Sequence, residues 1–517
     1  MLVLRLPARF PLRFIIALLL GALHSLSFLD DDAWPLQIIT LAALIAQGSH
    51  HPRGLSPWIE ARAGFAFGLG WFLAGTHWIY VSLHNYGDMA APLAAAATLL
   101  LCAYMSLYPA LATGLRALID SRLHLGPARS ALLLFPPLWM ASEWLRGSVL
   151  TGYPWLASGY AHIGSPLAGY APVVGVYGIA LLAAACAGAI ALLGARQNAR
   201  AATLVLIGIV LTGSLLRQVE WASPAGKPVS VRLLQGNIPQ ELKFVEGRLA
   251  QTLQTYVELI EKKPAQLIVL PETALPRFLH QMPEDLLQRL AAFSSNTGSS
   301  IAFGVPVYEN NGAYFNSVVA YTPDGAPAQR YDKTHLVPFG EFVPWGFSWF
   351  VDLMHIPLGD FNRGKIDAQP MTLAGLRVAF NVCYEDLFGA EIARQASVAN
   401  VLINVSNVAW FGDSLALPQH LQASRMRAIE TARPMLRATN TGKTAAIDEH
   451  GRVLAELPTY STASLDLNIQ GMSGDTPYTR WRDGAILLAG ALLLAAAVAG
   501  KRSGRTNHPA RRDNRDF

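Results

Sequence analysis

Charged residues are scarce in this chain of 517 residues: aspartate, glutamate, lysine and arginine make up 15% of it, against about 25% in a typical soluble domain. The shortage is uneven, because residues 1–226 hold 20 charged side chains, residues 227–483 hold 47, residues 484–500 hold none and residues 501–517 hold 8. A wholly soluble protein of this size would need a charged surface throughout. The distribution instead predicts a membrane region, a water-soluble domain, one more span and a charged tail.

Cysteine is scarce too, and the three cysteines exclude a disulfide framework. The net charge is +5, but the last seventeen residues carry six Lys or Arg and two Asp, which leaves only +1 for the rest of the chain. Because this basicity belongs to a tail and not to a groove, we expect no nucleic-acid partner. The sequence also shows no phosphate-binding loop and no zinc-type spacing of Cys and His, so we expect no cofactor and no metal.

Eight apolar runs come close to the roughly 20 residues that a helix needs to cross a bilayer. They are residues 13–28, 34–47, 61–83, 89–115, 131–145, 166–194, 201–216 and 484–500. The short loops on one side, together with the tail, hold 16 Lys and Arg residues, whereas the opposite short loops hold one, Arg146. The positive-inside rule then predicts that both termini are cytoplasmic and that the large domain is exported. A cleaved signal peptide is the alternative for the first run, because its start is basic.

These runs divide the chain into seven transmembrane helices in residues 1–217, a periplasmic domain in 218–483, an eighth transmembrane helix in 484–500 and a basic cytoplasmic tail in 501–517. In the exported domain, β-rich runs alternate with helical stretches, which is typical of an α/β fold. Strands are predicted at residues 229–234, 267–270, 300–307, 317–322, 377–382 and 401–405, with a hairpin of 443–448 and 452–457. Helices are predicted at residues 244–262, 283–293 and 417–432.

Three segments place an ionisable residue near the end of a predicted strand, where side chains of neighbouring strands meet. The first is Glu272, which follows the apolar run 267–270 and Pro271. A carboxylate in partly apolar surroundings has a raised pKa and suits a general base or acid. The alternative is an ordinary turn glutamate that caps the next helix.

The second is Lys333, in an aromatic loop rich in proline and glycine that covers residues 331–341. An ammonium group fixed near an acyl carbon would stabilise the oxyanion that develops during acyl transfer. The alternative is a surface lysine. We interpret His335 of the same loop as a structural residue and not as the base for a cysteine.

The third is Cys383, which follows the run 378–382 and precedes Glu385 and Asp386. It is the only cysteine outside the predicted spans, so in an oxidising compartment it has no intramolecular partner. Such a cysteine is either buried and inert or a reactive thiol. Its place at a strand end beside two carboxylates favours the reactive thiol.

Glutamate, lysine and cysteine in this order at strand ends resemble the nitrilase superfamily, whose members form an α-β-β-α sandwich. Five segments are similar, more specifically, to the apolipoprotein N-acyltransferase family: residues 143–147, 235–239, 338–341, 383–385 and 408–413. The resemblance covers almost the whole chain and implies a multi-span α-helical membrane domain joined to a nitrilase-like sandwich. Phe244 departs from it, because the family would place tryptophan in this substrate-contacting loop.

The resemblance implies transfer in two stages at a bacterial inner membrane. A phospholipid gives an acyl chain to Cys383, and the thioester then acylates the α-amino group of the diacylglyceryl-cysteine of a lipoprotein. Glu272 would be the base, and Lys333 would stabilise the oxyanion together with the Tyr384 backbone N–H. The resemblance further assigns Glu341 and Glu385 to hold the lysine and the thiol, and it implies substrate-lining residues at Asn316, Trp410, Phe411, Phe244, Glu143 and Arg146. We expect a monomer.

Two alternatives stay open. A membrane-tethered amidase of the nitrilase type would hydrolyse its thioester, but it would not need eight spans around an exported site. A membrane scaffold or transporter with an inactive domain would need polar residues inside the spans, and Glu143 is the main one. Glu143 and Arg146, three residues apart, are predicted to form an ion pair that either packs against a neighbouring span or contacts lipid headgroups.

Overall fold

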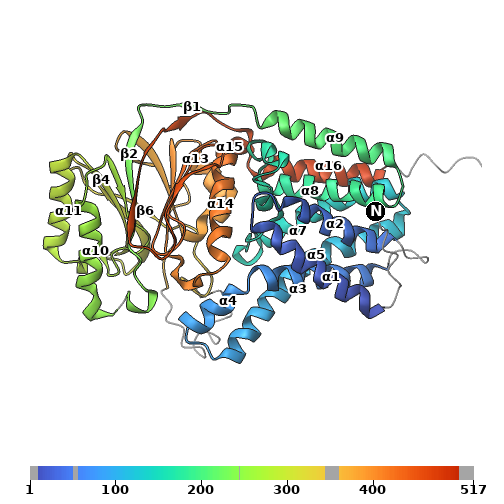
Figure 1. Cartoon of the computed structure of the whole chain (residues 1–517), viewed down its shortest axis with the longest axis horizontal. Coiled ribbons are helices and arrows are strands. Elements are labelled where there is room, and N and C mark those ends of the chain that lie inside the picture. Colours follow the sequence, from blue (N-terminus) through green and yellow to red (C-terminus); the bar gives the residue numbers. More distant parts are fainter. Residues whose placement is uncertain (1–9, 50–55, 244, 344–359, 500–517) are drawn as a thin grey trace, which may run out of the picture.

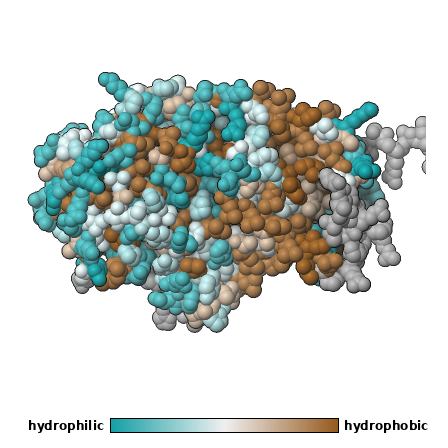
Figure 2. Space-filling model, viewed as in Figure 1, coloured by the Kyte–Doolittle hydropathy of each residue, from teal (hydrophilic) through white to brown (hydrophobic). Residues whose placement is uncertain are grey.

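The computed structural model describes residues 10–49, 56–243, 245–343 and 360–499. It has two parts placed end to end, a bundle of helices and a sandwich of sheets and helices (Figure 1). The visible surface of the bundle is mostly apolar, whereas that of the sandwich is mostly polar (Figure 2). The charge-poor and charge-rich parts of the sequence therefore form separate regions of the molecule.

The bundle contains a helix in each of the eight predicted spans. Its helices are α1 (Phe10–Ser25), α2 (Trp34–Ser49), α3 (Pro57–Gly75), α4 (Trp78–Val81), α5 (Ala91–Leu123), α6 (Pro127–Arg129), α7 (Phe135–Arg146), α8 (Ala171–Gly194), α9 (Ala199–Leu216) and α16 (Asp483–Ala499).

Only some of these helices meet the length and composition of a membrane span. Within the described residues, three segments are long and apolar enough, namely Ala91–Leu123, Pro166–Gly194 and Ala199–Leu216. Three shorter apolar helices are Leu12–Phe28, Trp34–Gly48 and Asp483–Ala499. The predicted spans 61–83 and 131–145 fall in neither group. Helix α3 has 19 residues but includes Glu60 and Arg62, and α7 has 12 residues and includes Glu143 and Arg146. A total of eight spans stays a prediction.

Glycine allows α3 to approach both α1 and α5. A Cβ atom on Gly70 of α3 would lie 1.9 Å from the backbone oxygen of Leu18 in α1. A Cβ atom on Gly68 would lie 2.9 Å from the Cα atom of Ser106 in α5. Small residues let membrane helices pack backbone to backbone, so these positions hold α3 between its two neighbours.

The sandwich contains two six-stranded sheets, with the strand orders β13-β2-β3-β4-β5-β6 and β12-β11-β10-β9-β8-β7. Strands β2, β3 and β4 are parallel, as are β8, β9 and β10. The first sheet comprises β2 (Val229–Gln235), β3 (Leu267–Val269), β4 (Ser300–Tyr308), β5 (Tyr314–Tyr321), β6 (Gln329–Asp332) and β13 (Ala463–Ile469). The second comprises β7 (Met371–Leu373), β8 (Leu376–Val382), β9 (Val401–Ser406), β10 (Met435–Thr439), β11 (Ala445–Ile447) and β12 (Val453–Glu456). A separate pair joins β1 (Ser223–Pro224) to β14 (Met472–Ser473).

Helices cover the outer face of each sheet, which confirms the predicted α-β-β-α sandwich (Figure 1). Helices α10 (Leu249–Glu261) and α11 (Glu284–Thr297) pack on the first sheet, and α13 (Gly389–Ala396) and α14 (Ala416–Thr431) pack on the second. Apolar side chains from both sheets fill the space between them, for example Leu233 and Phe380. The helix predicted from residue 244 begins later, at Leu249.

Helix α14 lies between the second sheet and the bundle (Figure 1). Its Arg425 forms an ion pair with Asp31, which follows α1, with 2.7 Å between the charged atoms. Its Gln419 accepts hydrogen bonds from the indole N–H groups of Trp78 and Trp155, at 3.2 and 2.8 Å. The sandwich thus contacts the segments after α1, α3 and α7, which all lie at one end of the bundle.

Candidate active site

Glu272 lies just beyond the end of β3, as predicted, and the residue is 7% exposed. Its Oε1 accepts a hydrogen bond from the Asn316 amide and its Oε2 accepts one from the Asn407 backbone N–H, both at 2.8 Å. These partners come from β5 and from the segment after β9, so Glu272 is held between the two sheets and does not cap a helix.

Lys333 follows β6 directly, and it is buried at 1% exposure, which contradicts the surface-lysine alternative. Its Nζ atom lies 2.9 Å from Glu341 Oε1 and 3.7 Å from Glu272 Oε1. Burial alone would lower the pKa of Lys333, but the carboxylates of Glu341 and Glu272 outweigh it and raise that pKa above its usual value. Lys333 therefore stays an ammonium ion at any physiological pH.

Cys383 follows β8 in a left-handed backbone conformation, with φ at +54°. This conformation costs a non-glycine residue roughly 1–2 kcal/mol, so the surroundings must hold it. The Cys383 carbonyl oxygen accepts hydrogen bonds from Asn404 Nδ2 at 3.0 Å and from His420 Nε2 at 3.2 Å. Burial and the nearby carboxylate of Glu272 raise the pKa of the thiol, and Lys333 opposes them. The sulfur rests as a thiol and needs a base to become a nucleophile.

Glu341 and Asn316 connect the lysine to the base. Glu341 Oε1 accepts from Lys333 Nζ and from Asn316 Nδ2, at 2.9 and 2.8 Å, and its Oε2 accepts from the Val337 backbone N–H at 2.8 Å. Asn316 therefore donates to both carboxylates. The structure places Asn316 among the charged groups of the site, and its predicted contact with substrate stays a prediction.

Glu385 links the Lys333 loop to the Cys383 turn. Its carboxylate accepts hydrogen bonds from the backbone N–H groups of Thr334 and His335, at 2.6 and 2.9 Å, and from that of Val382, at 2.6 Å. Burial raises the pKa of Glu385, although Lys333 and these N–H groups oppose the rise. The neighbouring Tyr384 points its hydroxyl toward the bundle and donates to the Gly152 carbonyl at 2.9 Å.

A second buried charged cluster holds the main chain at Cys383. Asp386 Oδ1 accepts from His420 Nε2, and Asp386 Oδ2 accepts from Arg437 Nη1, both at 2.8 Å, and from the Ser424 hydroxyl. His420 Nδ1 lies 3.1 Å from Arg437 Nη2. With Arg437 donating to Nδ1, the proton of His420 resides on Nε2, which donates to Asp386 and to the Cys383 carbonyl.

The ring nitrogens of His335 bond to groups other than the cysteine. Its Nδ1 pairs with Glu391 at 2.9 Å, its Nε2 lies 3.0 Å from the Thr151 carbonyl oxygen, and its ring stacks on Phe388. Nε2 therefore contacts the bundle, whereas Nδ1 contacts α13 within the sandwich. The structural interpretation of His335 agrees with these contacts.

The segment after β9 carries two of the predicted lining residues, Trp410 and Phe411. The Phe411 ring packs against Trp78 of the bundle, with ring centres 4.6 Å apart, and against Trp155 at 6.1 Å. Phe411 therefore lies where the two parts of the protein meet. Phe244 lies outside the described residues.

The predicted ion pair between Glu143 and Arg146 is wrong, because the two residues bind main chain and, within the described part of the chain, form no ion pair with each other. Glu143 accepts hydrogen bonds from the Ser158 hydroxyl and from its backbone N–H, the latter at 2.7 Å. Arg146 donates to the carbonyl oxygens of Tyr153 and Trp155 at 2.6 and 2.7 Å. Both side chains are at most 2% exposed. They hold the segment between α7 and α8 against the sandwich, and their predicted contact with substrate stays a prediction.

Several residues of the site were not predicted from the sequence, namely Lys243, Asn404, Asn407, His420 and Arg437. The predicted helix 417–432 contains His420. The sequence around His420 does not indicate that this histidine lies near Cys383. Lys243 follows the 235–239 motif by four residues, and Asn407 directly precedes the 408–413 motif. These proximities were the available signals.

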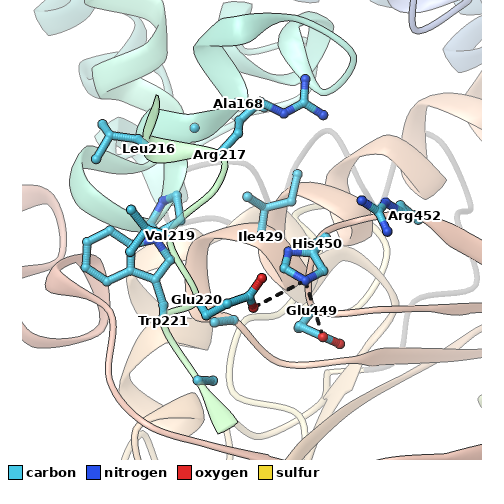
Figure 3. Close-up of a pocket in the computed structure, with 14 residues that line it drawn as sticks. Ala168, Leu216, Arg217, Val219, Glu220, Trp221, Ile429, Glu449, His450 and Arg452 are labelled. Carbon is cyan, nitrogen blue, oxygen red and sulfur yellow. Dashed lines mark ion pairs between the residues drawn. The ribbon is translucent and has the colours of Figure 1, made fainter. Parts of the chain in front are cut away.

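A pocket elsewhere in the molecule is lined by residues after α9 and by the turn between β11 and β12 (Figure 3). His450 there lies between Glu220 and Glu449, at 3.6 and 3.4 Å. The pocket contains none of the predicted site residues, so it is separate from the cluster around Cys383.

Comparisons with known proteins agree with this architecture. Residues 20–189 match the apolipoprotein N-acyltransferase N-terminal domain, and residues 230–477 match the carbon–nitrogen hydrolase family. The apolipoprotein N-acyltransferase of Ralstonia nicotianae is 48% identical over 94% of this chain and 93% of its own length. That of Nitrosomonas europaea is 44% identical over 94% of this chain and 97% of its own. A carbon–nitrogen hydrolase superfamily protein of Xanthomonas campestris, of solved structure, is 19% identical, with a TM-score of 0.37 over 53% of this chain and 98% of its own.

The fold and the family matches define a carbon–nitrogen hydrolase domain attached to an apolar helical domain, which is a membrane-associated member of the nitrilase superfamily. The similarity to the two relatives extends over nearly the full length of each protein. The chain belongs to the apolipoprotein N-acyltransferase family.

Proposed function

We propose that this protein transfers an acyl chain from a phospholipid to Cys383, and from there to the α-amino group of the N-terminal diacylglyceryl-cysteine of an apolipoprotein. Its family and the names of its relatives support this reaction. The observation that carries it is the convergence of Glu272, Lys333 and Cys383, whose charges act on one another at the ends of three strands. No cofactor enters the proposal.

In the first stage, Glu272 takes the proton of the Cys383 thiol, and the sulfur attacks the ester carbonyl carbon of the phospholipid. The Lys333 ammonium and the Tyr384 backbone N–H stabilise the oxyanion of the tetrahedral intermediate. When this intermediate collapses, the carbon–oxygen ester bond breaks. The lysophospholipid alkoxide then leaves with the proton from Glu272, and the acyl group remains as a thioester.

In the second stage, the amine of the lipoprotein attacks the thioester carbonyl carbon. Glu272 receives a proton from the amine and returns one to the departing sulfur, so an amide forms and the thiol is restored. The thioester must survive until the amine arrives, and exclusion of water favours this. Tyr384 and Phe388, which flank the site, belong to the same apolar core as the bundle.

We also propose the orientation of the protein in the membrane. The sandwich contacts the bundle through Asp31, Gly75, Gly152 and Val176, all on the side that the positive-inside rule places outside the cytoplasm. The opposite end holds Arg13, near the start of α1, which pairs with Glu60 near the start of α3. These contacts support cytoplasmic termini, a periplasmic sandwich and the domain limits 1–217, 218–483, 484–500 and 501–517. The monomer stays a prediction.

A pair of single-cysteine variants tests the orientation. Leu150→Cys lies between α7 and α8 and is expected outside, whereas Gln197→Cys lies between α8 and α9 and is expected inside. Both positions are exposed, the native Cys102 and Cys186 are buried, and the partly exposed Cys383 is replaced by alanine in both variants. A membrane-impermeant maleimide should label the first variant in intact cells and the second only after lysis. The reverse pattern would contradict the orientation.

A two-substrate assay tests the reaction. The purified protein receives a phospholipid with a labelled acyl chain, together with either a diacylglyceryl lipopeptide or the same lipopeptide with its amine acetylated. We expect label in the free-amine lipopeptide and little label in free fatty acid. Equal release of fatty acid with both peptides would instead show a hydrolase of the amidase type.

A further inference from the structure

A second buried lysine, Lys243, lies beside the proposed base. It follows the turn Gln240–Leu242 and is 2% exposed. Its ammonium donates a hydrogen bond to the backbone carbonyl oxygen of Glu272 at 3.2 Å. Lysine is almost never fully buried unless it is paired, and the two-stage reaction above gives this lysine no role.

The same turn reaches Glu272 by a second route. Gln240 Oε1 accepts a hydrogen bond from Asn407 Nδ2 at 2.8 Å, and the backbone N–H of Asn407 donates to Glu272 Oε2, also at 2.8 Å. The turn therefore holds the main chain of Glu272 through Lys243 and its carboxylate through Asn407. A change in the turn would move the base relative to the thiol.

The charges of the site call for another cation. Lys333 provides one positive charge, whereas the two carboxylates that it pairs with, Glu272 and Glu341, provide two negative charges. Transfer of a proton from Cys383 to Glu272 moves one negative charge to the sulfur and leaves the sum unchanged. When it is protonated, Lys243 offsets this excess charge, whether Glu272 or the sulfur holds it.

Burial lowers the pKa of Lys243 to about 8, and the two titratable groups that act on it, Glu272 from the loop after β3 and Cys383 from the end of β8, raise it against that effect. The ammonium is thus present below about pH 8 and is lost as the pH rises through that value. The positive charge of Lys333 persists over the same range, because its pKa is raised.

We infer that Lys243 is a positioning residue for the loading of the acyl chain, which holds the main chain of Glu272 and offsets the excess negative charge of the site. The inference rests on the proposed roles of Cys383 and Glu272. It assigns Lys243 no contact with substrate.

The test measures the rate at which the full-length protein acquires an acyl group from phosphatidylethanolamine, by intact mass, between pH 6 and pH 10. Lys243→Met should load about tenfold more slowly at pH 7, with an unchanged KM for phospholipid. A tenfold change in rate corresponds to a change of one unit in the pKa difference between the thiol and its base. In the wild-type protein the rate should fall above about pH 8, as Lys243 loses its proton. Lys243→Arg keeps its charge and should move this fall to higher pH. Lys263→Met, at an exposed position after α10, is the matched control.

Three results would overturn the inference: a Lys243→Met rate equal to that of the wild-type protein, an alkaline fall that Lys243→Arg does not shift, or a wild-type rate that keeps rising through pH 9. The last two remain decisive if Lys243→Met fails to fold, as judged by its melting temperature in detergent. Failure of the wild-type protein to form any adduct on Cys383 would instead contradict the proposed function itself.

Discussion

Two buried charged clusters meet at Cys383. The first, which we call the reacting cluster, is Glu272, Lys333 and Glu341, and it acts on the sulfur. The second, which we call the backing cluster, is Asp386, His420, Ser424 and Arg437, and it holds the main chain through the Cys383 carbonyl. Both clusters contain buried charged side chains, but they differ in whether a proton moves between their groups.

In the backing cluster every charge is fixed. Burial alone would raise the pKa of Asp386, but His420 and Arg437 hold it below its usual value, so the carboxylate stays ionised. In the reacting cluster the thiol pKa is raised, and in the proposed reaction a proton passes to Glu272 before the sulfur attacks. One cluster therefore fixes the geometry so that the other can move a proton.

The largest effect should follow from changes in the reacting cluster. Cys383→Ala should abolish loading, and Glu272→Gln or Lys333→Ala should slow it by about a thousandfold or more, because each removes the proposed nucleophile, base or oxyanion donor. Loading is measured with labelled phospholipid after rapid quenching. Glu284→Gln, at an exposed position of α11, is the control and should load normally. A Glu272→Gln rate close to that of the wild-type protein would remove Glu272 from the mechanism.

Changes in the backing cluster should reduce stability more than chemistry. Arg437→Met leaves the Asp386 charge buried without its arginine, and breaking such a pair costs about 3–5 kcal/mol. The melting temperature in detergent should fall markedly, while loading per folded molecule should fall less than in Lys333→Ala. The control is Asp367→Asn, which breaks an exposed pair with Arg394, worth at most about 1 kcal/mol. Equal melting temperatures for the two variants would show that the backing cluster does not stabilise the fold.

The smallest effect should come from the hydroxyl that connects the cysteine turn to the bundle. Tyr384→Phe keeps the ring and removes the hydrogen bond to the Gly152 carbonyl, a loss of about 1 kcal/mol. The kcat/KM for transfer to lipopeptide should fall by about fivefold. Loss of all transfer in Tyr384→Phe would show that the hydroxyl takes part in the chemistry.

The reacting cluster was accessible from the sequence because its parts lie at strand ends, where Glu272 and Cys383 follow apolar runs. Strand β6, which precedes Lys333, was missed because Gln329–Asp332 is short and polar. Strand β10 was missed because it contains the buried Arg437, whose partners lie far away in the sequence. Strand β13 was missed although its alternating leucine residues were visible.

The sequence could not predict how the bundle supports the site. Glu143 and Arg146 have the spacing of a helical ion pair, yet main-chain groups of the segment after α7 bind both side chains. Lys243 has the local sequence of a surface lysine, and only the fold brings it to Glu272. The run predicted as one span at 61–83 is divided by the end of α3 at Gly75. Each of these features depends on contacts between distant segments, which periodicity does not report.

The central claim is that Cys383 carries the acyl group. Its most direct test is the intact mass of the full-length protein after exposure to phospholipid without a lipoprotein acceptor, followed by peptide mapping. We expect one added acyl mass that is located on Cys383, is sensitive to hydroxylamine and is discharged by an amine-bearing lipopeptide. An adduct of the same mass on the Cys383→Ala variant, or transfer to lipopeptide by that variant, would contradict the claim.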